Sequence, residues 1–513
     1  MNANSKMVVN TCIMYARVAL TMGVTLLSSR WVLLALGESD FGIYSLVAGM
    51  LSLLSFLNVT MASSTQRFLS YSLGKGDSYE LNCVFNLSII LHLCIGLTVF
   101  AIFEICGNLF LDNILEIPMG KEADAEFVLH CLSVSMFISI VTVPFNASLI
   151  THENMLFVAF VQIGEAMLKL AVAVILLYYT GERIRLYAFC MMFIPVFSNL
   201  MFIVYCLKNY KETKLSIKAA KRIDLLKQFS CYTGWNLIGG ISHLFKSQGI
   251  AMLLNTFKGV VINAAFGIAN QVNSQLEFFS STIVTATRPQ IVKSEGNGNR
   301  ARMLQVSVTT CKLTFLMLSV LVAPFITECS YIMELWLKKV PEYTVSFVQL
   351  FLICSLIRQL YTGVSIGIES VGSIKYLQIF VGGLHFFVIP AGYFLLYFSY
   401  DVLSVFYMLI CEEAICLVLT IIISNNVTGL KIKKFIFRCV LPCIVTFILV
   451  ICTCMYSRQL FNNELYNLLF SCVISLVLTS LLAYYVVFDK NEQSVVNYYV
   501  NSVINKFNII SYE

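Results

Sequence analysis

Ionisable side chains inside long apolar stretches are the residues of this sequence that could do chemistry. Arg17 and Lys246 could grip an anionic group, while Glu277 and the neighbours Glu412 and Glu413 could bind or release a cation such as a proton. An ionisable side chain at the centre of a bilayer costs at least about 2.5 kcal/mol on insertion scales, so each one needs a partner or a function. The pattern therefore indicates a polar site inside a membrane protein.

Polar side chains recur on one face of the stretch 259–299. Asn263, Asn270 and Glu277 are spaced seven residues apart, so each lies only about 20° from the last around a helix. The preceding stretch carries Asn236 and His243 on one face, with Lys246 beside it. The expected lining of a polar cavity is Arg17, Asn236, His243, Lys246, Asn263, Asn270, Gln271 and Glu277.

Two roles stay open for Glu277. It could form a buried ion pair with Lys246 or with Arg17. Alternatively, it could couple the protein to an ion, a role that Glu412 and Glu413 could share because they lie in the middle of an apolar run.

Other charges within the apolar runs have simpler explanations. Glu165 and Lys169 are four residues apart, so we expect them to pair on one helix. Lys312 lies within two turns of the end of its run, so we expect its ammonium group to reach the membrane surface along its flexible stem.

Catalytic motifs are absent from the sequence. The five histidines are scattered, and no phosphate-binding glycine–lysine loop, nucleophile elbow or zinc-binding histidine pair occurs. The 18 cysteines lie mostly inside apolar runs, where free cysteine is a small apolar filler. We expect no enzyme activity, no cofactor, no metal site and no nucleic-acid partner.

The composition predicts an all-α polytopic membrane protein. Of its 513 residues, 58% are hydrophobic and only 12% are charged, half the share of a typical soluble domain, and the mean hydropathy is +0.82. Runs near the length of about 20 residues that spans a bilayer recur along the chain. Fourteen spans are expected, near 9–36, 41–63, 84–110, 127–150, 155–179, 186–207, 229–256, 260–285, 306–327, 343–367, 375–398, 402–424, 439–456 and 467–488.

A basic loop divides these spans into two halves. The expected organisation is an N-terminal lobe of six helices (1–207), a basic cytoplasmic linker (208–228), a C-terminal lobe of six helices (229–424), a basic loop with two further helices (425–488) and a cytoplasmic tail (489–513). Most of the 34 Lys and Arg residues fall in alternate loops, which places both termini in the cytoplasm by the positive-inside rule.

The two halves contain an internal repeat. The expected second span begins with Phe-Gly-Ile (41–43) and ends in SSTQRF, followed by SLGKGD; the eighth has Phe-Gly-Ile (266–268) and ends in TATRPQ, followed by SEGNGN. Arg67 and Arg288 therefore occupy matching helix ends, where they could form a cytoplasmic gate. Repeated halves suit a transporter that works by alternating access.

Several segments resemble the Wzx-like polysaccharide flippases of the multidrug/oligosaccharidyl-lipid/polysaccharide (MOP) exporter superfamily. They include FGIYSLVAGML, SSTQRFLSYSLGKGD, YIMELWLKKVPEYT (331–344), IKYLQIFVGG (374–383) and, most specifically, the stretch from Ser247 to Glu295. The resemblance covers nearly the whole chain. It implies a MATE-like fold with two pseudo-symmetric six-helix lobes in a V shape, a cavity lined by the first, second, seventh and eighth helices, and two extra C-terminal helices.

The resemblance also implies a function. Such proteins move undecaprenyl-diphosphate-linked oligosaccharides from the cytoplasmic to the periplasmic leaflet of the bacterial inner membrane, for O-antigen, lipopolysaccharide or capsule synthesis. Arg17 and Lys246 would then contact the diphosphate, and the amides of the cavity would contact the sugars. Expected partners are membrane lipids, H⁺ or Na⁺ as the coupling ion, a polysaccharide polymerase and a chain-length regulator.

Three alternatives remain. A multidrug/cation antiporter of the same superfamily would be expected to carry an acidic residue in its N-terminal half, whereas the stretch 9–36 holds Arg17 and Arg30 and no carboxylate. A flippase of the peptidoglycan precursor lipid II also has fourteen spans and a cationic cavity. A membrane glycan polymerase or acyltransferase would need a large catalytic loop, and the expected outer loops are short.

Overall fold

The chain is almost entirely helical. The computed structural model describes residues 3–52, 55–113, 120–216, 222–458 and 463–497, and it has no β-strand within these ranges. Two compact units divide the chain. Unit 1 comprises Met1–Met7, Ser242–Ile291 and Arg300–Glu513, and unit 2 comprises Val8–Ile241 and Val292–Asn299.

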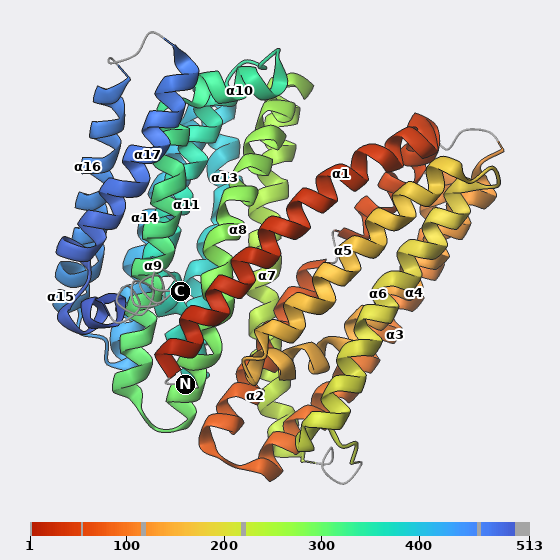
Figure 1. The fold of residues 1–513 in the computed structure, drawn as a ribbon, viewed down its shortest axis with the longest axis horizontal. Helices are drawn as coiled ribbons and strands as arrows, with labels where there is room; N and C mark the ends of the chain where they lie inside the picture. The colour runs from red at the N-terminus through yellow and green to blue at the C-terminus, as the bar shows by residue number, and fades with distance from the viewer. Residues whose placement is uncertain (1–2, 53–54, 114–119, 217–221, 459–462, 498–513) are drawn as a thin grey trace, which may run out of the picture. The chain divides into compact units, whose positions relative to one another are not determined.

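Unit 2 is built from the N-terminal helices. In Figure 1, α3, α4, α5 and α6 lie side by side, and α4 packs against α2, α3 and α6 around an apolar core. The expected junction between the first two spans is present inside α1, where Gly37 has a positive φ of 75° that breaks the helix. The elements are α1 (Ala3–Ser52), α2 (Ser55–Lys75), α3 (Ser78–Asn113), α4 (Glu122–Thr151), α5 (Met155–Tyr178), α6 (Arg183–Asn209) and the 3₁₀ turn η1 (Lys211–Thr213).

Unit 1 contains most of the remaining helices. Here α11 packs against α9 and α14, with Phe347 stacked on Phe406 at 4.1 Å between ring centroids, and the last two long helices, α16 and α17, pack against α9 and each other. The bounds are α7 (Ile223–Lys258), α8 (Val260–Gly296), α9 (Arg300–Thr327), α10 (Cys329–Leu337), α11 (Thr344–Val371), α12 (Lys375–Leu377), η3 (Gln378–Gly382), α13 (Gly383–Tyr397), α14 (Leu403–Thr428), α15 (Ile432–Phe435), η4 (Ile436–Val440), α16 (Leu441–Ser457), α17 (Glu464–Leu482) and η5 (Ala483–Val487). The unit boundary falls inside α7 and near the end of α8.

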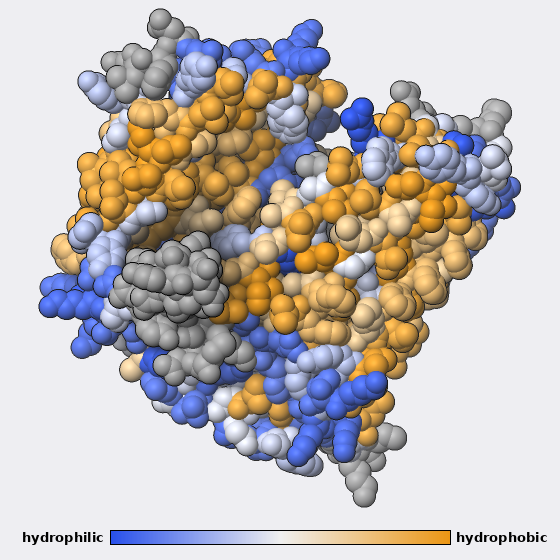
Figure 2. All heavy atoms as spheres, in the orientation of Figure 1, coloured by the Kyte–Doolittle hydropathy of each residue, from blue (hydrophilic) through white to orange (hydrophobic). Residues whose placement is uncertain are grey.

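The predicted all-α polytopic class is confirmed. Within the described residues, 12 helices are long and apolar enough to cross a membrane, and Figure 2 shows broad hydrophobic surfaces over the helices of each unit. The other two expected spans are not among these 12. The span 41–63 includes residues outside the described part of the chain, and 260–285 lies in α8, whose amides and carboxylate make it more polar.

The repeated helices α2 and α8 end in the same way. A glycine with positive φ follows each helix. Gly76, with a φ of 77°, comes directly after α2, and Gly298, with a φ of 73°, comes two residues after the end of α8. Near these ends, the backbones approach closely: a Cβ on Gly74 would lie 2.8 Å from the Cα of Lys293, and one on Gly296 would meet the backbone of Tyr71. The two contacts are reciprocal under a shift of 222 positions in the sequence, as expected for a structural repeat.

The two arginines expected at the helix ends lie inside the helices instead. Each is eight residues before the last residue of its helix, because α2 continues to Lys75 and α8 to Gly296. Arg67 lies over the rings of Phe68, Tyr71 and Tyr232 at 4.6 to 5.3 Å, and Arg288 forms an ion pair with Glu369. Their role as a gate stays a prediction.

Candidate functional site

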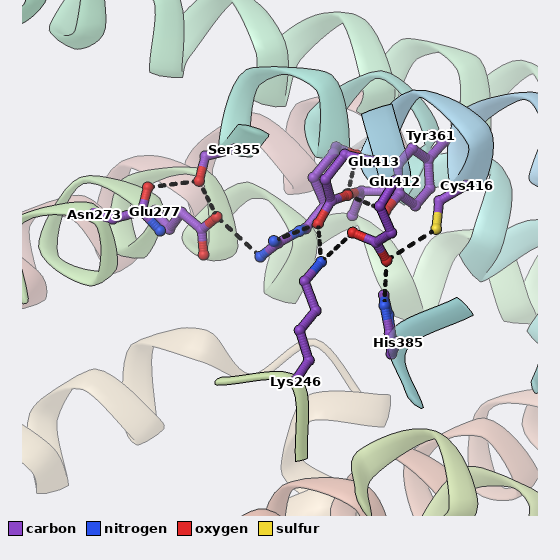
Figure 3. Close-up of polar contacts among 11 residues, drawn as sticks. Lys246, Asn273, Glu277, Ser355, Tyr361, His385, Glu412, Glu413 and Cys416 are labelled. Atoms are coloured by element: carbon purple, nitrogen blue, oxygen red, sulfur yellow. Dashed lines mark hydrogen bonds and ion pairs between the residues drawn. The ribbon is translucent and has the colours of Figure 1, made fainter. Parts of the chain in front are cut away.

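Two adjacent carboxylates in the middle of α14 form the centre of a buried charge network in unit 1. The side chains of Glu413 and Glu412 are 1% and 6% exposed. Consecutive residues of a helix point in different directions, yet here both carboxylates reach partners on the neighbouring helices (Figure 3). We call this network the carboxylate cluster. It comprises Lys246, Glu277, Arg358, His385, Glu412 and Glu413.

Lys246 on α7 connects the two carboxylates. Its Nζ lies 2.5 Å from Oε2 of Glu412 and 2.9 Å from Oε1 of Glu413. The sequence left a pair between Lys246 and Glu277 open, and the structure gives the lysine these two partners on α14 instead. Because the lysine and both carboxylates are nearly excluded from solvent, each charge depends on the others for compensation.

Arg358 and Tyr361 bring α11 into the cluster. The guanidinium donates from Nη2 to Oε1 of Glu413 at 2.7 Å, and the tyrosine hydroxyl donates to Oε2 at 2.7 Å. Residues three apart lie on one face of a helix, so α11 presents both donors to the same carboxylate. Glu413 therefore receives hydrogen bonds from three side chains, Lys246 included.

Glu277 on α8 forms the more open end of the cluster. Its Oε1 accepts from Nη1 of Arg358 at 3.2 Å and lies 2.5 Å from Oγ of Ser355, which is 2.6 Å from Oδ1 of Asn273. The side chains of Glu277 and Arg358 are 25% and 27% exposed, in contrast to the buried Glu413. This end of the cluster is therefore the one that a small cation or a proton could reach.

His385 on α13 completes the cluster at Glu412. Its Nδ1 lies 2.6 Å from Oε1 of Glu412, and the ring of His243 stands edge-on to it with centroids 6.0 Å apart. The ligand atoms of His385, Glu412 and Cys416 lie within 4.8 Å of one another, so this group is where a metal ion could bind. Lys246 already contacts the same carboxylate, however, and competes with a metal for it.

The charges of the carboxylate cluster do not balance. Three carboxylates face two permanent cations, and two imidazoles lie close by. Uptake of one proton or one monovalent cation would make the cluster neutral when the imidazoles are neutral. With neutral imidazoles, the cluster therefore offers a position where one cation could bind.

Unit 2 contains a different kind of buried charge. Arg17 on α1 donates from Nη1 to the amide oxygen of Gln162 on α5, and its buried Nε has no hydrogen-bond partner in the described part of the chain. The carboxylates Glu165 and Glu104 each contact a base: Lys169 at 2.7 Å, which confirms the pair expected from the sequence, and His130 at 2.6 Å. Arg17 thus keeps its positive charge next to a neutral partner.

The remaining predicted cavity residues do not belong to the cluster. Asn236 donates to Ser64 at 3.0 Å within unit 2. On α8, Asn270 and Gln271 are exposed and Asn263 is half-buried, and none of the three makes a hydrogen bond with the cluster. The structure thus brings Lys246, His243 and Glu277 together with Glu412 and Glu413, whereas Arg17 and Asn236 belong to unit 2.

Sequence reasoning missed several members of the site. Arg358 is a charged residue within an expected span, and its unassigned positive charge could have been matched with the unassigned carboxylates of α14. Ser355 and Tyr361 precede and follow it at a spacing of three, which places them on the same helix face. For Asn273 and His385, the sequence offers no indication of a place in the site except that each is a polar residue in an apolar stretch.

Comparison with known proteins identifies the fold. No family model and no curated protein matches the sequence. Among solved structures, a multidrug-resistance MATE family transporter of the MOP superfamily in an outward-facing conformation has a TM-score of 0.72 at 15% identity, with 84% of this chain and 96% of that chain covered. A MATE protein in a bent conformation has a TM-score of 0.72 at 15% identity, with coverage of 85% and 97%.

A third structure differs in its description. It is a MOP superfamily transporter from Pyrococcus furiosus, whose reversed binding-pocket polarity is said to suggest a different function. Its TM-score is 0.71 at 14% identity, with 85% of this chain and 97% of that chain covered. The chain is therefore a multi-pass membrane protein with the fold of MATE-like transporters of the MOP superfamily.

Proposed function

We propose that the protein is a flippase that moves undecaprenyl-diphosphate-linked polysaccharide repeat units from the cytoplasmic to the periplasmic leaflet by alternating access. The observation that carries the proposal is the half-buried charge of Arg17, whose hydrogen-bond partner Gln162 is neutral. In this proposal, the protein lies in the bacterial inner membrane with both termini in the cytoplasm. It supplies O-antigen, lipopolysaccharide or capsule synthesis, together with a polymerase and a chain-length regulator.

The charge of Arg17 suits a diphosphate. An arginine that is already paired with a carboxylate would have to break that pair to bind an anion, whereas an amide oxygen is easily exchanged for a phosphate oxygen. The planar guanidinium can bind two such oxygens at once, and no residue of the described ranges accepts a hydrogen bond from its Nε. In contrast, Glu104 and Glu165 each contact a base, which disfavours binding of a cationic substrate by these carboxylates.

The carboxylate cluster supplies a site for the coupling ion. Three carboxylates with two permanent cations favour uptake of H⁺ or Na⁺. Glu277 at the more exposed end is the group that an entering ion would meet first, and Glu412 and Glu413 lie behind it. Uptake and release of the ion on opposite sides of the membrane would give transport its direction.

Flipping by the purified full-length protein in liposomes tests the proposal. The substrate is a fluorescent polyprenyl-diphosphate oligosaccharide, and the readout is the rate at which it becomes protected from an external quencher. Arg17→Gln should slow flipping at least about tenfold, because a hydrogen bond to a charged group contributes about 1.5–3 kcal/mol. Arg30→Gln is the matched control, since Arg30 is an exposed arginine of the same helix. Flipping at the wild-type rate by Arg17→Gln would contradict the proposal.

A multidrug/cation antiporter is the second candidate. The observation in its favour is the surplus carboxylate of the cluster, because a negative site in the membrane attracts organic cations as well as protons. The same liposomes distinguish the two functions. A flippase moves the labelled diphosphate lipid and leaves a cationic dye such as ethidium untransported, whereas an antiporter transports the dye against a proton or sodium gradient and leaves the lipid in its original leaflet.

A further inference from the structure

A basic cavity in unit 1 lies apart from the carboxylate cluster. Its volume is about 360 Å³, and it is enclosed by α9, the turn after α14, α15, the start of η4 and the segment after η5. The charged side chains that line it are Lys312, Lys431, Lys434, Arg438, Asp489 and Glu492. Four cations against two anions give the lining a surplus of two positive charges. Figure 2 shows hydrophilic surface where Figure 1 labels α15.

One carboxylate, that of Glu492, is already bound inside this cavity. Lys312 is expected from the sequence to reach the membrane surface, but its side chain is only 3% exposed and its Nζ lies 2.7 Å from Oε2 of Glu492. Thr309 donates from Oγ1 to the other carboxylate oxygen at 2.6 Å. The cavity therefore holds an ammonium and a hydroxyl group in the geometry that binds an oxyanion.

Local structure fixes Glu492 at this position. The backbone N–H of Glu492 donates to Oδ1 of Asp489 at 3.0 Å, and the backbone N–H of Asp489 donates to Oε2 of Glu492 at 3.0 Å. This reciprocal pair is a capping box at the start of the short helix that follows η5. Glu492 neutralises Lys312, so the excess positive charge of the cavity comes from its other cations, Lys431, Lys434 and Arg438. We call these three residues the outer cations.

The three outer cations are available for a ligand. Lys431, Lys434 and Arg438 are exposed, and none of their side chains forms an ion pair within the described ranges. Lys434 and Arg438 lie in the first turns of a candidate membrane span that starts at Ile432. An anion bound by these groups would therefore sit where the span enters the membrane.

Large apolar side chains are exposed directly beside these cations. Phe437 is 68% exposed and Leu441 is 47% exposed on the same helical segment. A soluble phosphate compound would gain nothing from such neighbours, whereas a lipid places its phosphate and its acyl chains next to each other. We propose that this cavity binds the phosphate of an anionic glycerophospholipid, with the acyl chains along η4 and α16. This inference does not depend on the proposed transport function.

Lipid binding to the purified full-length protein tests the inference. In native mass spectrometry of the protein in detergent, phosphatidylglycerol should form adducts at lower concentration than phosphatidylcholine. The double variant Lys434→Gln/Arg438→Gln should weaken phosphatidylglycerol binding at least about tenfold, because each basic residue near an anionic membrane surface contributes to binding. Lys433→Gln is the matched control, since Lys433 is an exposed neighbour that does not line the cavity.

Two further arms make the test decisive. Glu492→Gln should strengthen phosphatidylglycerol binding, because Lys312 then lacks its carboxylate partner. Glycerol 1-phosphate and inorganic phosphate should compete only at much higher concentration than the lipid. Equal loss of binding in Lys433→Gln and the double variant, no preference for phosphatidylglycerol, or competition by free phosphate at lipid concentrations would each overturn the inference. Only folded protein contributes lipid adducts to the spectrum, so a partly unfolded variant remains interpretable.

Discussion

The two units of this protein hold buried charge in different ways. In unit 1, Glu413 accepts hydrogen bonds from three side chains on two other helices, and the cluster around it has more carboxylates than permanent cations. In unit 2, the half-buried Arg17 donates to one neutral amide, and its Nε has no hydrogen-bond partner in the described part of the chain. In the first arrangement, the carboxylates and the cations compensate one another, and carboxylates outnumber permanent cations by one. In the second, a positive charge has a neutral side chain as its hydrogen-bond partner.

Removal of a charge should therefore have different consequences in the two units, mainly for stability in unit 1 and mainly for ligand binding in unit 2. A buried charge held by several partners cannot be removed without weakening the compensation of each of those partners, so its loss should mainly destabilise the fold. A buried charge held by a neutral group is easier to remove, so its loss should mainly affect whatever the charge binds. Single substitutions in each unit should therefore separate a loss of stability from a loss of transport.

Neutralising Glu413 should have the largest effect. Glu413→Gln leaves the charges of Lys246 and Arg358 with less compensation in a buried site. Breaking a buried ion pair by removing one partner typically costs about 3–5 kcal/mol. The expected result is a clear drop in the thermal denaturation midpoint of the purified protein in detergent, measured by loss of helical circular dichroism.

A carboxylate outside the cluster provides the control for this effect. Glu334 on α10 is exposed in the same unit, so Glu334→Gln should leave the midpoint close to that of the wild type. Equal midpoints for Glu413→Gln and the wild type would show that the cluster does not hold unit 1 together.

Removing the charge of Arg17 should affect stability much less. Arg17→Gln replaces one hydrogen bond to Gln162, so we expect a cost of about 1–2 kcal/mol, well below that of Glu413→Gln. The same denaturation measurement gives both numbers. If Arg17→Gln proves as destabilising as Glu413→Gln, the distinction between the two units is wrong, and the slow flipping of this variant would be a folding defect.

Neutralising Glu277 should show whether this residue of the cluster couples transport to an ion or only stabilises the fold. Glu277→Gln removes one ion pair at the more exposed end, at 3.2 Å from Arg358, so its stability cost should be near 1 kcal/mol. If Glu277 is the entrance for the coupling ion, transport by this variant should lose most of its response to an imposed proton or sodium gradient. An unchanged response in both gradients would restrict Glu277 to a structural role.

Local patterns made part of the site predictable. The pair of Glu165 with Lys169 follows from a spacing of four on one helix, and the structure contains it. Lys246 and Glu413 are 167 residues apart, so no spacing rule connects them. A pair between Lys246 and Glu277 is one of the alternatives that the sequence leaves open, because both residues lie on neighbouring polar helices. No local pattern indicates that the partners of the lysine lie on α14.

More of the fold than of the site could be predicted from the sequence. Recurrent apolar runs predict membrane helices because length and hydropathy are local properties, and the break at Gly37 follows from the polar junction after the first run. The exact ends of α2 and α8 were not predictable in the same way. Polar residues continue both helices beyond the apolar run, so hydropathy no longer marks where the helix ends.

The smallest effect is expected at a charged contact outside the membrane spans. In unit 2, Glu212 on η1 lies 2.5 Å from Nε2 of His152 at the end of α4, and Ser148 donates to the same carboxylate oxygen at 3.3 Å. Burial alone would raise the pKa of Glu212, but the hydrogen bonds from His152 and other donors outweigh it and hold that pKa below its ordinary value of 4.5. The side chain is 7% exposed, so the contact is partly shielded from solvent.

The lowered pKa fixes the sign of the pH dependence. Above pH 4.5, Glu212 is ionised in the folded and the unfolded chain, and its full stabilisation, about 1 kcal/mol, is present. As the pH falls below 4.5, the unfolded chain takes up the proton first, and the stabilisation is lost as the pH passes through the lower folded-state pKa. The difference in denaturation midpoint between wild type and Glu212→Gln should therefore shrink as the pH falls from about 5 to about 3. A difference that does not shrink by about pH 3 would mean that folding does not lower the pKa of Glu212, and that the carboxylate of this contact, unlike those of the carboxylate cluster, is not held in its ionised form.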